Sequence, residues 1–242
     1  MSRQTDDMHR ELERIFCAFP NIHTSDIPGI DLYMDQVTTF LQENLRGLTR
    51  DPDDDRILTK TMINNYVKNK VLIPPVKKKY SREHMMLLIM IYYMKNFLSI
   101  GDIRLITGPL MEQYARPASV PPASRKKESA RKDVREEPEG KHLPSDGGGS
   151  QKSVAADSAE TRPLSITDIY ESVSQNVDQD LPRIREDILR QIDLAANDFS
   201  DVPEEERPLL QRFSLICRLS AEVCIRKLFI EKLLDADSGN GT

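Results

Sequence analysis

The spacing of apolar side chains in the first half of the chain is helical throughout. Large apolar residues recur every three or four positions, which is the period of an amphipathic helix. The acidic turn between Arg50 and Asp55 and the Pro74–Pro75 pair interrupt this pattern. Gly108 and Pro109 are expected to end the last helix of this part. The pattern predicts five helices, over Met8–Phe19, Asp31–Leu45, Thr59–Lys70, Ser81–Phe97 and a short one from Ser99, with Asp31, Thr59 and Ser99 at helix starts.

The second half is also predicted to be helical. Ile166, Ile169, Val173 and Val177 form one apolar row, and a second row runs from Leu181 to Phe199. A last helix is expected from about Pro208 to Leu234, with Leu209, Ile216, Val223 and Ile230 seven residues apart. Its wide apolar face allows two interpretations. It packs inside the molecule, or it pairs two copies as a homodimer.

The stretch from 117 to 163 differs from both halves in composition. It is rich in Pro, Ser, Gly and charged residues, and its large aliphatic side chains are Val120, Val134, Leu143 and Val154. Such a segment buries too little apolar surface to offset the entropy of ordering, so a disordered linker is expected. The predicted layout is a helical domain at 1–116, a linker at 117–163 and a C-terminal helical region at 164–235. The fold class is mainly α.

Charge changes this picture in one place. The chain has a net charge of −5, but the segment from Arg56 to Arg104 has ten basic and two acidic residues, a local charge of +8. A cationic segment in an acidic protein favours a surface that meets a large anion, most commonly a nucleic acid. The plain alternative is a solvated, lysine-rich face.

The remaining chemistry of the sequence is sparse. Three cysteines fit a reducing cytoplasm, and Cys217 and Cys224 are expected to be buried in apolar surroundings. The longest apolar run, Met85–Met94, is too short for a membrane span. The four histidines are scattered, so neither a metal site nor a cofactor is expected. No acid–base pair or hydrolase motif is apparent, so an enzyme is not expected.

The cationic segment has the layout of a helix followed by a basic wing. On the helix, polar residues oppose Met62, Ile63, Tyr66 and Val67, and the wing is expected to contain short strands at Val71–Ile73 and Lys79–Tyr80. Lysines reach phosphates, whereas asparagines can read an adenine edge. The candidate DNA-binding residues are Thr59, Lys60, Thr61, Asn64, Asn65, Lys68, Lys77, Lys78, Lys79, Tyr80 and Arg82.

These residues resemble a known family. The string TKTMINNYVKNKVLIPPVKKKYS is similar to the MerR-type winged helix-turn-helix, and FLSIGDIRLI is similar to a later segment of that family. The resemblance covers about 56–107, although Lys70 and Phe97 occupy positions where that family often has Gly. The strings LYMDQV, TKTMINNYVK and KKKYSREH, within Phe19–Thr107, together with IYES at Ile169–Ser172, resemble a bacterial family known as a domain of unknown function. That resemblance implies a cytoplasmic protein with a DNA-binding module and no established activity.

The sequence therefore predicts a transcriptional regulator that binds double-stranded DNA. The polar flank of the helix would face the major groove, and the lysine triplet would hold the adjacent backbone. The alternative is an adaptor that uses the same helical fold to bind an acidic protein surface. Operator, effector and regulatory sign do not follow from the sequence.

Overall fold

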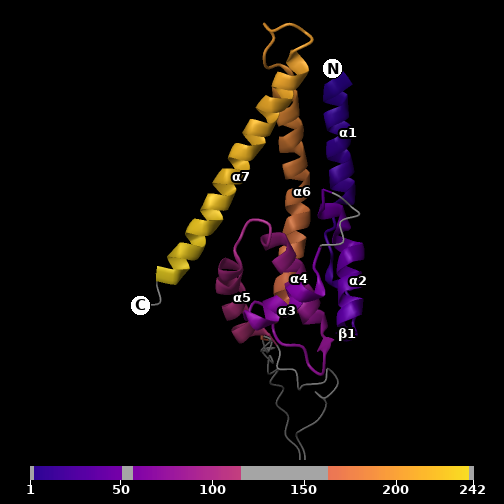
Figure 1. Cartoon of the computed structure of the whole chain (residues 1–242), viewed down its shortest axis with the longest axis vertical. Helices are drawn as coiled ribbons and strands as arrows, with labels where there is room; N and C mark the ends of the chain where they lie inside the picture. The colour runs from indigo at the N-terminus through magenta and orange to yellow at the C-terminus, as the bar shows by residue number, and fades with distance from the viewer. Residues whose placement is uncertain (1–2, 51–56, 116–162, 240–242) are drawn as a thin grey trace, which may run out of the picture. The chain divides into compact units, whose positions relative to one another are not determined.

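The computed structural model describes residues 3–50, 57–115 and 163–239 (Figure 1). The described residues are mainly helical, as predicted. The predicted linker at 117–163, except for Pro163, lies outside them, as do Asp51–Asp55 and Arg56. The elements are α1 (Arg3–Ala18), η1 (Thr24–Asp26), β1 (Leu32–Tyr33), α2 (Met34–Leu45), η2 (Arg46–Leu48), α3 (Lys60–Lys68), β2 (Lys79–Tyr80), α4 (Arg82–Met94), α5 (Ile100–Tyr114), α6 (Ile166–Ala196) and α7 (Arg207–Gly239).

Hydroxyl side chains cap three of these helices. Thr59 Oγ1 accepts a hydrogen bond from the amide of Met62 at 3.2 Å, and Ser99 Oγ accepts one from the amide of Asp102 at 3.2 Å. Each bond satisfies an amide that has no partner inside its helix. The starts predicted at Thr59 and Ser99 are therefore confirmed. Ser165 caps α6 in the same way.

The hydrophobic core is built around α4. This helix is apolar nearly all round, and the side chains from His84 to Ile89 are all buried. Val37 and Leu41 of α2 and Ile63 of α3 pack into the same core and are 0% exposed. A helix with apolar residues on every side needs neighbours on every side. The prediction that this helix is buried is confirmed.

The expected end of α5 at Gly108 and Pro109 is wrong. The helix continues to Tyr114 with Pro109 inside it, and α6 likewise runs through Pro182 as one helix of 31 residues. A proline removes the hydrogen bond to the carbonyl four residues before it. Those carbonyls belong to Leu105 and Asp178, both at exposed positions where water can replace the lost donor.

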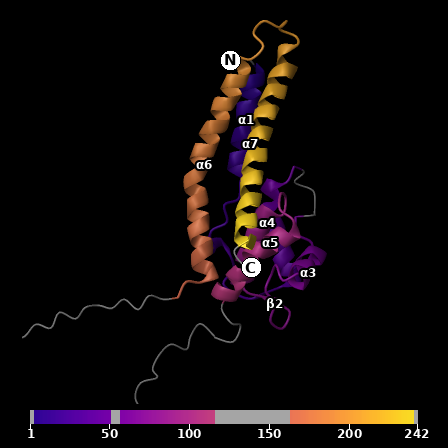
Figure 2. The same cartoon turned by 90° about the vertical axis from the view of Figure 1, so that its left-hand side faces the viewer.

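The C-terminal helices share a core with the N-terminal ones. The described residues before the predicted linker and those from Leu164 onward form one compact unit, whereas the sequence predicts a helical domain and a separate C-terminal region. Ile166 and Tyr170 of α6 are 0% and 4% exposed within the core around α4. The Tyr170 hydroxyl donates to the carbonyl of Ile22 at 2.6 Å. Both views show α1 alongside α6 (Figures 1 and 2), where Arg185 forms an ion pair with Glu13.

Two short strands form an antiparallel pair. Leu32 aligns with Tyr80, and Tyr33 aligns with Lys79. The strand at Lys79–Tyr80 is as predicted. The start of α2 differs from the prediction at Asp31, because strand β1 comes first and the helix begins only at Met34. The strand expected at Val71–Ile73 is absent from the described residues. The amides of Val71 and Leu72 instead bond back to the carbonyl of Tyr66, at 2.8 and 3.2 Å, and finish α3.

The last helix, α7, is the element that differs most from expectation. Cys217 and Cys224 are exposed, so the prediction that both are buried is wrong. Several large apolar residues of α7 are exposed as well, among them Phe213 and Val223. None of the helices in the described part has the length and apolar character needed to cross a membrane.

Candidate nucleic-acid interface

Helix α3 presents a polar row to solvent. Ile63 is 0% exposed and Tyr66 is 6% exposed, and both anchor the inner side of the helix. Thr61, Asn64 and Lys68 are exposed and follow one another at spacings of three and four residues. Side chains at that spacing lie above one another on one face. The predicted polar flank is therefore a continuous solvent-facing row.

A lysine closes α3 in an unusual backbone conformation. The Val71 amide bonds to the Tyr66 carbonyl at 2.8 Å, and the Lys70 amide bonds to the Val67 carbonyl at 3.1 Å. This pair of bonds is a Schellman motif, in which the residue after the cap adopts a left-handed conformation and is usually Gly. Here Lys70 occupies that position with φ 58°.

The wing is a two-residue hairpin whose tip is also made of lysines. Val76 and Lys79 exchange both backbone hydrogen bonds, at 3.1 and 2.9 Å. Between them, Lys77 and Lys78 have φ values of 50° and 65°. Positive φ at both central residues defines a type I′ turn, for which Asn-Gly is the preferred pair.

The left-handed positions are concentrated at this surface. Among the described residues, four that are not glycine have positive φ, and three of them are Lys70, Lys77 and Lys78. A residue with a β-carbon in this conformation costs roughly 1–2 kcal/mol. Backbone strain of this kind gathers at functional sites, where the side chain is needed more than the relaxed turn.

Residues 33–35 bring the start of α3 and the wing together. Lys60, at the first turn of α3, forms an ion pair with Asp35. The Lys79 ammonium lies 5.2 Å from the centre of the Tyr33 ring. Since Tyr33 and Asp35 are two residues apart, the start of α3 and the base of the hairpin meet at the start of α2. Figures 1 and 2 both show the hairpin next to α3.

Three of the predicted DNA-binding residues on α3 are already engaged. The hydroxyl of Thr59 caps the helix, and Asp35 neutralises Lys60. The Asn65 side-chain carbonyl accepts a hydrogen bond from the Asn69 amide group at 2.8 Å. Thr61, Asn64 and Lys68 are the members of the predicted set on α3 whose side chains form no such bond among the described residues.

Two other predicted residues do not face solvent as expected. Tyr80 is 3% exposed, and its ring meets the His84 ring edge-on at 5.4 Å between centroids. The side chain of Tyr80 is enclosed by β1 and α4, so it packs inside the wing and does not project from it. Arg82 is half-buried, and its guanidinium donates to the carbonyl of Thr24. It ties the base of the wing to η1 and does not project from it.

His84 holds the hairpin to α4. Its Nδ1 accepts a hydrogen bond from the Ser81 amide at 3.0 Å, which leaves the proton on Nε2, 3.3 Å from the carbonyl oxygen of Pro74. Burial lowers the pKa of His84 below its usual value, and this effect outweighs the carbonyls of Pro74 and Ile73 and the charge of Asp31, which raise it. The ring is therefore neutral at pH 7 and serves as a structural link.

A second polar cluster was not visible in the sequence. Ser174 Oγ lies 3.3 Å from Nδ1 of His23, and His23 Nε2 lies 3.3 Å from the carboxylate of Asp178. The order resembles a hydrolase triad, but Ser174 is 6% exposed and its hydroxyl donates to Asn21 at 3.2 Å. The cluster fastens the loop before η1 to α6. His23 and Ser174 are 151 residues apart in the sequence, so their spacing gave no indication of the cluster.

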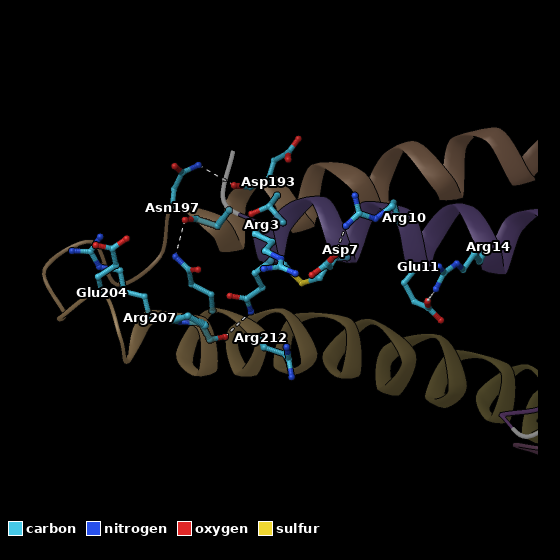
Figure 3. Close-up of a pocket in the computed structure, with 16 residues that line it drawn as sticks. Arg3, Asp7, Arg10, Glu11, Arg14, Asp193, Asn197, Glu204, Arg207 and Arg212 are labelled. Atoms are coloured by element: carbon cyan, nitrogen blue, oxygen red, sulfur yellow. Dashed lines mark hydrogen bonds and ion pairs between the residues drawn. The ribbon is translucent and has the colours of Figure 1, made fainter.

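A large cavity lies between the ends of α1, α6 and α7 (Figure 3). Its volume is about 1230 Å³, and side chains of both charges line it. Arg10 pairs with Asp7, and Arg14 pairs with Glu11, each within α1. Because these charges compensate one another, the cavity favours neither an anion nor a cation. Among the described residues, no group of three acidic, His or Cys side chains is placed to hold a metal ion.

Comparison with known proteins locates one matching region. Residues 22–124 match the model of a family described as a domain of unknown function (DUF1836). The match covers fewer than half of the 242 residues, and it includes α3 and the hairpin but not α1, α6 or α7. It agrees with the resemblance over Phe19–Thr107, whereas Ile169–Ser172 lies outside it. No curated protein and no solved structure matched the chain.

Proposed function

We propose that this protein binds double-stranded DNA through α3 and the lysine hairpin, and that it acts as a transcriptional regulator of the MerR-like winged helix type. Its action would be binding, without catalysis. The observation that carries the proposal is the set of left-handed lysines at 70, 77 and 78. Gly or Asn would relax these turns, but neither would supply a positive charge.

The order of elements supports the same function. Two packed helices, α2 and α3, precede a hairpin whose base pairs with the strand before α2. In a winged helix-turn-helix the second helix enters the major groove. Thr61, Asn64 and Lys68 are the exposed row of α3 that would face the bases. Lys77 and Lys78 would reach the phosphates beside them.

The first test is retention of fragmented genomic duplex DNA by the full chain near physiological salt. We expect a mobility shift whose affinity falls steeply with salt. Replacing Lys77, Lys78 and Lys79 with Ala should flatten the slope of log K against log salt by roughly 2.7, at about 0.9 per phosphate contact.

A matched control has the same loss of charge elsewhere. Arg10→Gln, Arg14→Gln and Arg183→Gln remove three exposed cations from α1 and α6. This variant should leave the slope unchanged. Equal slopes for all three proteins would contradict a role of the hairpin. Loss of all retention at physiological salt would favour the adaptor alternative, in which the same surface meets an acidic protein.

The homodimer expected from the C-terminal helices also stays a proposal. It concerns a different surface from α3 and the hairpin.

A further inference from the structure

Among the described residues, which include all seven tyrosines, Tyr33 is the one tyrosine whose side chain is exposed. Strand β1 explains the difference, because side chains alternate between the two faces of a strand. Leu32 is 6% exposed and belongs to the core, whereas Tyr33 is 54% exposed on the opposite face. An aromatic ring that stays in water has a large apolar surface to offer a partner.

The exposed ring belongs to a row of side chains that crosses the wing. Tyr33 aligns with Lys79 in the antiparallel pair, and Val76 exchanges backbone hydrogen bonds with Lys79 on the other side. Residues directly opposite each other on paired strands have their side chains on one face. We call Tyr33, Lys79 and Val76 the wing row. Its two apolar members are 54% and 43% exposed.

The cation in the middle of the wing row is held by the ring. The Lys79 ammonium lies 5.2 Å from the centre of the Tyr33 ring. Lys79 is half-buried, whereas Lys77 and Lys78 at the hairpin tip are exposed. A lysine that is free in solvent loses side-chain entropy when a ligand fixes it. Because the ring already restricts Lys79, less of that entropy is lost on binding.

A second contact of the same kind shows what a purely structural pair looks like. The Lys95 ammonium lies 4.8 Å from the centre of the Tyr92 ring, but that ring is 2% exposed and closed to any partner. The Tyr33 ring, in contrast, stays more than half exposed beside its lysine. The pair on the wing therefore leaves an apolar surface and a positive charge next to each other in solvent.

This combination matches the backbone of duplex DNA. Each nucleotide has an apolar deoxyribose next to a charged phosphate, and tyrosine hydroxyls are among the groups that bond to the backbone. The bases of a duplex are stacked on one another, so a ring beside the backbone meets the sugar and not the face of a base. Since Lys79 directly follows Lys77 and Lys78, the wing row continues the cationic surface of the hairpin tip.

We propose that Tyr33 is a DNA-contact residue outside the set predicted from the sequence. Its ring packs against a deoxyribose of the duplex, and it positions the Lys79 ammonium on an adjacent phosphate. The inference rests on the proposed function, because it names a further part of the same surface. It extends the contact from the hairpin to the residue directly before α2.

Substitutions of Tyr33 in the full chain separate the ring from the hydroxyl. Tyr33→Ala should weaken binding of a labelled duplex at least about fivefold, the usual effect of truncating a contacting tyrosine. The slope of log K against log salt should also fall by up to about 0.9, because Lys79 loses its support. Tyr33→Phe keeps the ring, so it should recover the slope and most of the affinity. Ile15→Ala is the matched control, since Ile15 is 53% exposed on α1, and it should change neither quantity.

A merely structural role for Tyr33 predicts a different result. If the ring only covered the stem of Lys79, Tyr33→Ala would lower the free energy of unfolding in urea and leave the DNA affinity and salt slope unchanged. Circular dichroism and urea unfolding of the same samples show that the variants are folded. Unchanged DNA binding by folded Tyr33→Ala overturns the inference and leaves the proposed function intact.

The absence of tryptophan from the chain allows a direct measurement that does not depend on a loss of affinity. Tyr33→Trp places a single indole in the wing row, and Ile15→Trp places one on α1. With saturating duplex, the indole of Tyr33→Trp should become several-fold less accessible to the neutral quencher acrylamide. The indole of Ile15→Trp should keep its accessibility. Equal accessibility of Tyr33→Trp with and without duplex overturns the inference.

Two further outcomes separate this inference from the proposed function. Wild-type protein that retains no duplex near physiological salt contradicts both. Tighter binding of a single strand than of the duplex, with strong quenching of the Tyr33→Trp indole, would mean that the ring stacks on unpaired bases. That outcome overturns the contact with the deoxyribose of a duplex.

Discussion

Lys60 and Asp35 form an ion pair that joins the first turn of α3 to the first turn of α2. Both side chains are more than half exposed, so the pair adds little to stability. Its effect on the proposed DNA surface is larger, because it neutralises one of the lysines that the sequence placed in the major groove.

Removing the carboxylate should strengthen DNA binding. In Asp35→Asn, Lys60 is released and one negative charge is lost beside the phosphates, so the slope of log K against log salt should steepen by about 0.9. Lys60→Gln should weaken binding less than Lys78→Gln, since only Lys78 is unpaired. Titrations of labelled duplex at several salt concentrations measure both. A weaker complex for Asp35→Asn would show that the carboxylate itself contacts the ligand.

The hairpin should be more stable and less functional with the residues its turn prefers. Lys77→Asn with Lys78→Gly relieves two left-handed positions, so the free energy of unfolding should rise by about 1–3 kcal/mol. The salt slope of DNA binding should fall by about 1.8. Urea unfolding and DNA titration of the same samples report the two effects. A variant that loses stability would mean that the lysines make contacts beyond the turn.

Stability should fall in mild acid because of His84. Its pKa is lowered by burial in the folded chain, whereas the unfolded chain takes up a proton near pH 6.5. Below that pH the unfolded state binds more protons than the folded state. The contribution of His84 to the free energy of unfolding therefore decreases as the pH falls, and it is constant above about pH 7.

The His84→Gln variant isolates that effect. Glutamine can keep an acceptor for Ser81 and a donor for Pro74. Chemical unfolding between pH 5.5 and 7.5 should give a smaller slope for the variant, by up to about 1.4 kcal/mol per pH unit. Since His9 and His23 are present in both proteins, their contributions cancel in the difference. Parallel curves would show that His84 does not control this range.

Tyr170 should contribute to the stability of the whole unit. Its hydroxyl donates to the Ile22 carbonyl at 2.6 Å, and burial raises its pKa. Tyr170→Phe leaves that carbonyl without a partner, at a cost of about 1–3 kcal/mol. Ser172→Ala is a suitable control, because Ser172 lies two residues further along α6 and its side chain is exposed. If the contact between α6 and the N-terminal helices added nothing to stability, the two variants would have the same free energy of unfolding in urea.

Helix positions were largely predictable from the sequence because local rules decide them. Apolar periodicity located α4, and the hydroxyl residues Thr59 and Ser99 marked true helix starts. The rule that proline ends a helix failed at Pro109. A proline can stay inside a helix where water reaches the carbonyl that it leaves without a donor, and that exposure is a property of the tertiary structure.

The candidate site was predictable in outline but not in detail. Periodicity correctly placed Asn64 and Lys68 on an exposed row. It did not reveal that Asp35 pairs with Lys60, because that contact depends on the packing of α2 against α3. It also did not reveal that Tyr80 is enclosed, because that depends on the pairing of β1 with β2. Lys70 stands where the MerR-type family often has Gly. Its left-handed conformation gives that substitution its meaning.

The position of Ile166 and Tyr170 in the core has a practical consequence. The family match stops at residue 124, before both of them. A fragment cut at that boundary would lack two side chains that fill its interior, and water would reach the sockets they leave behind. We expect such a fragment to aggregate on expression, so sequence similarity alone would divide this protein at the wrong place.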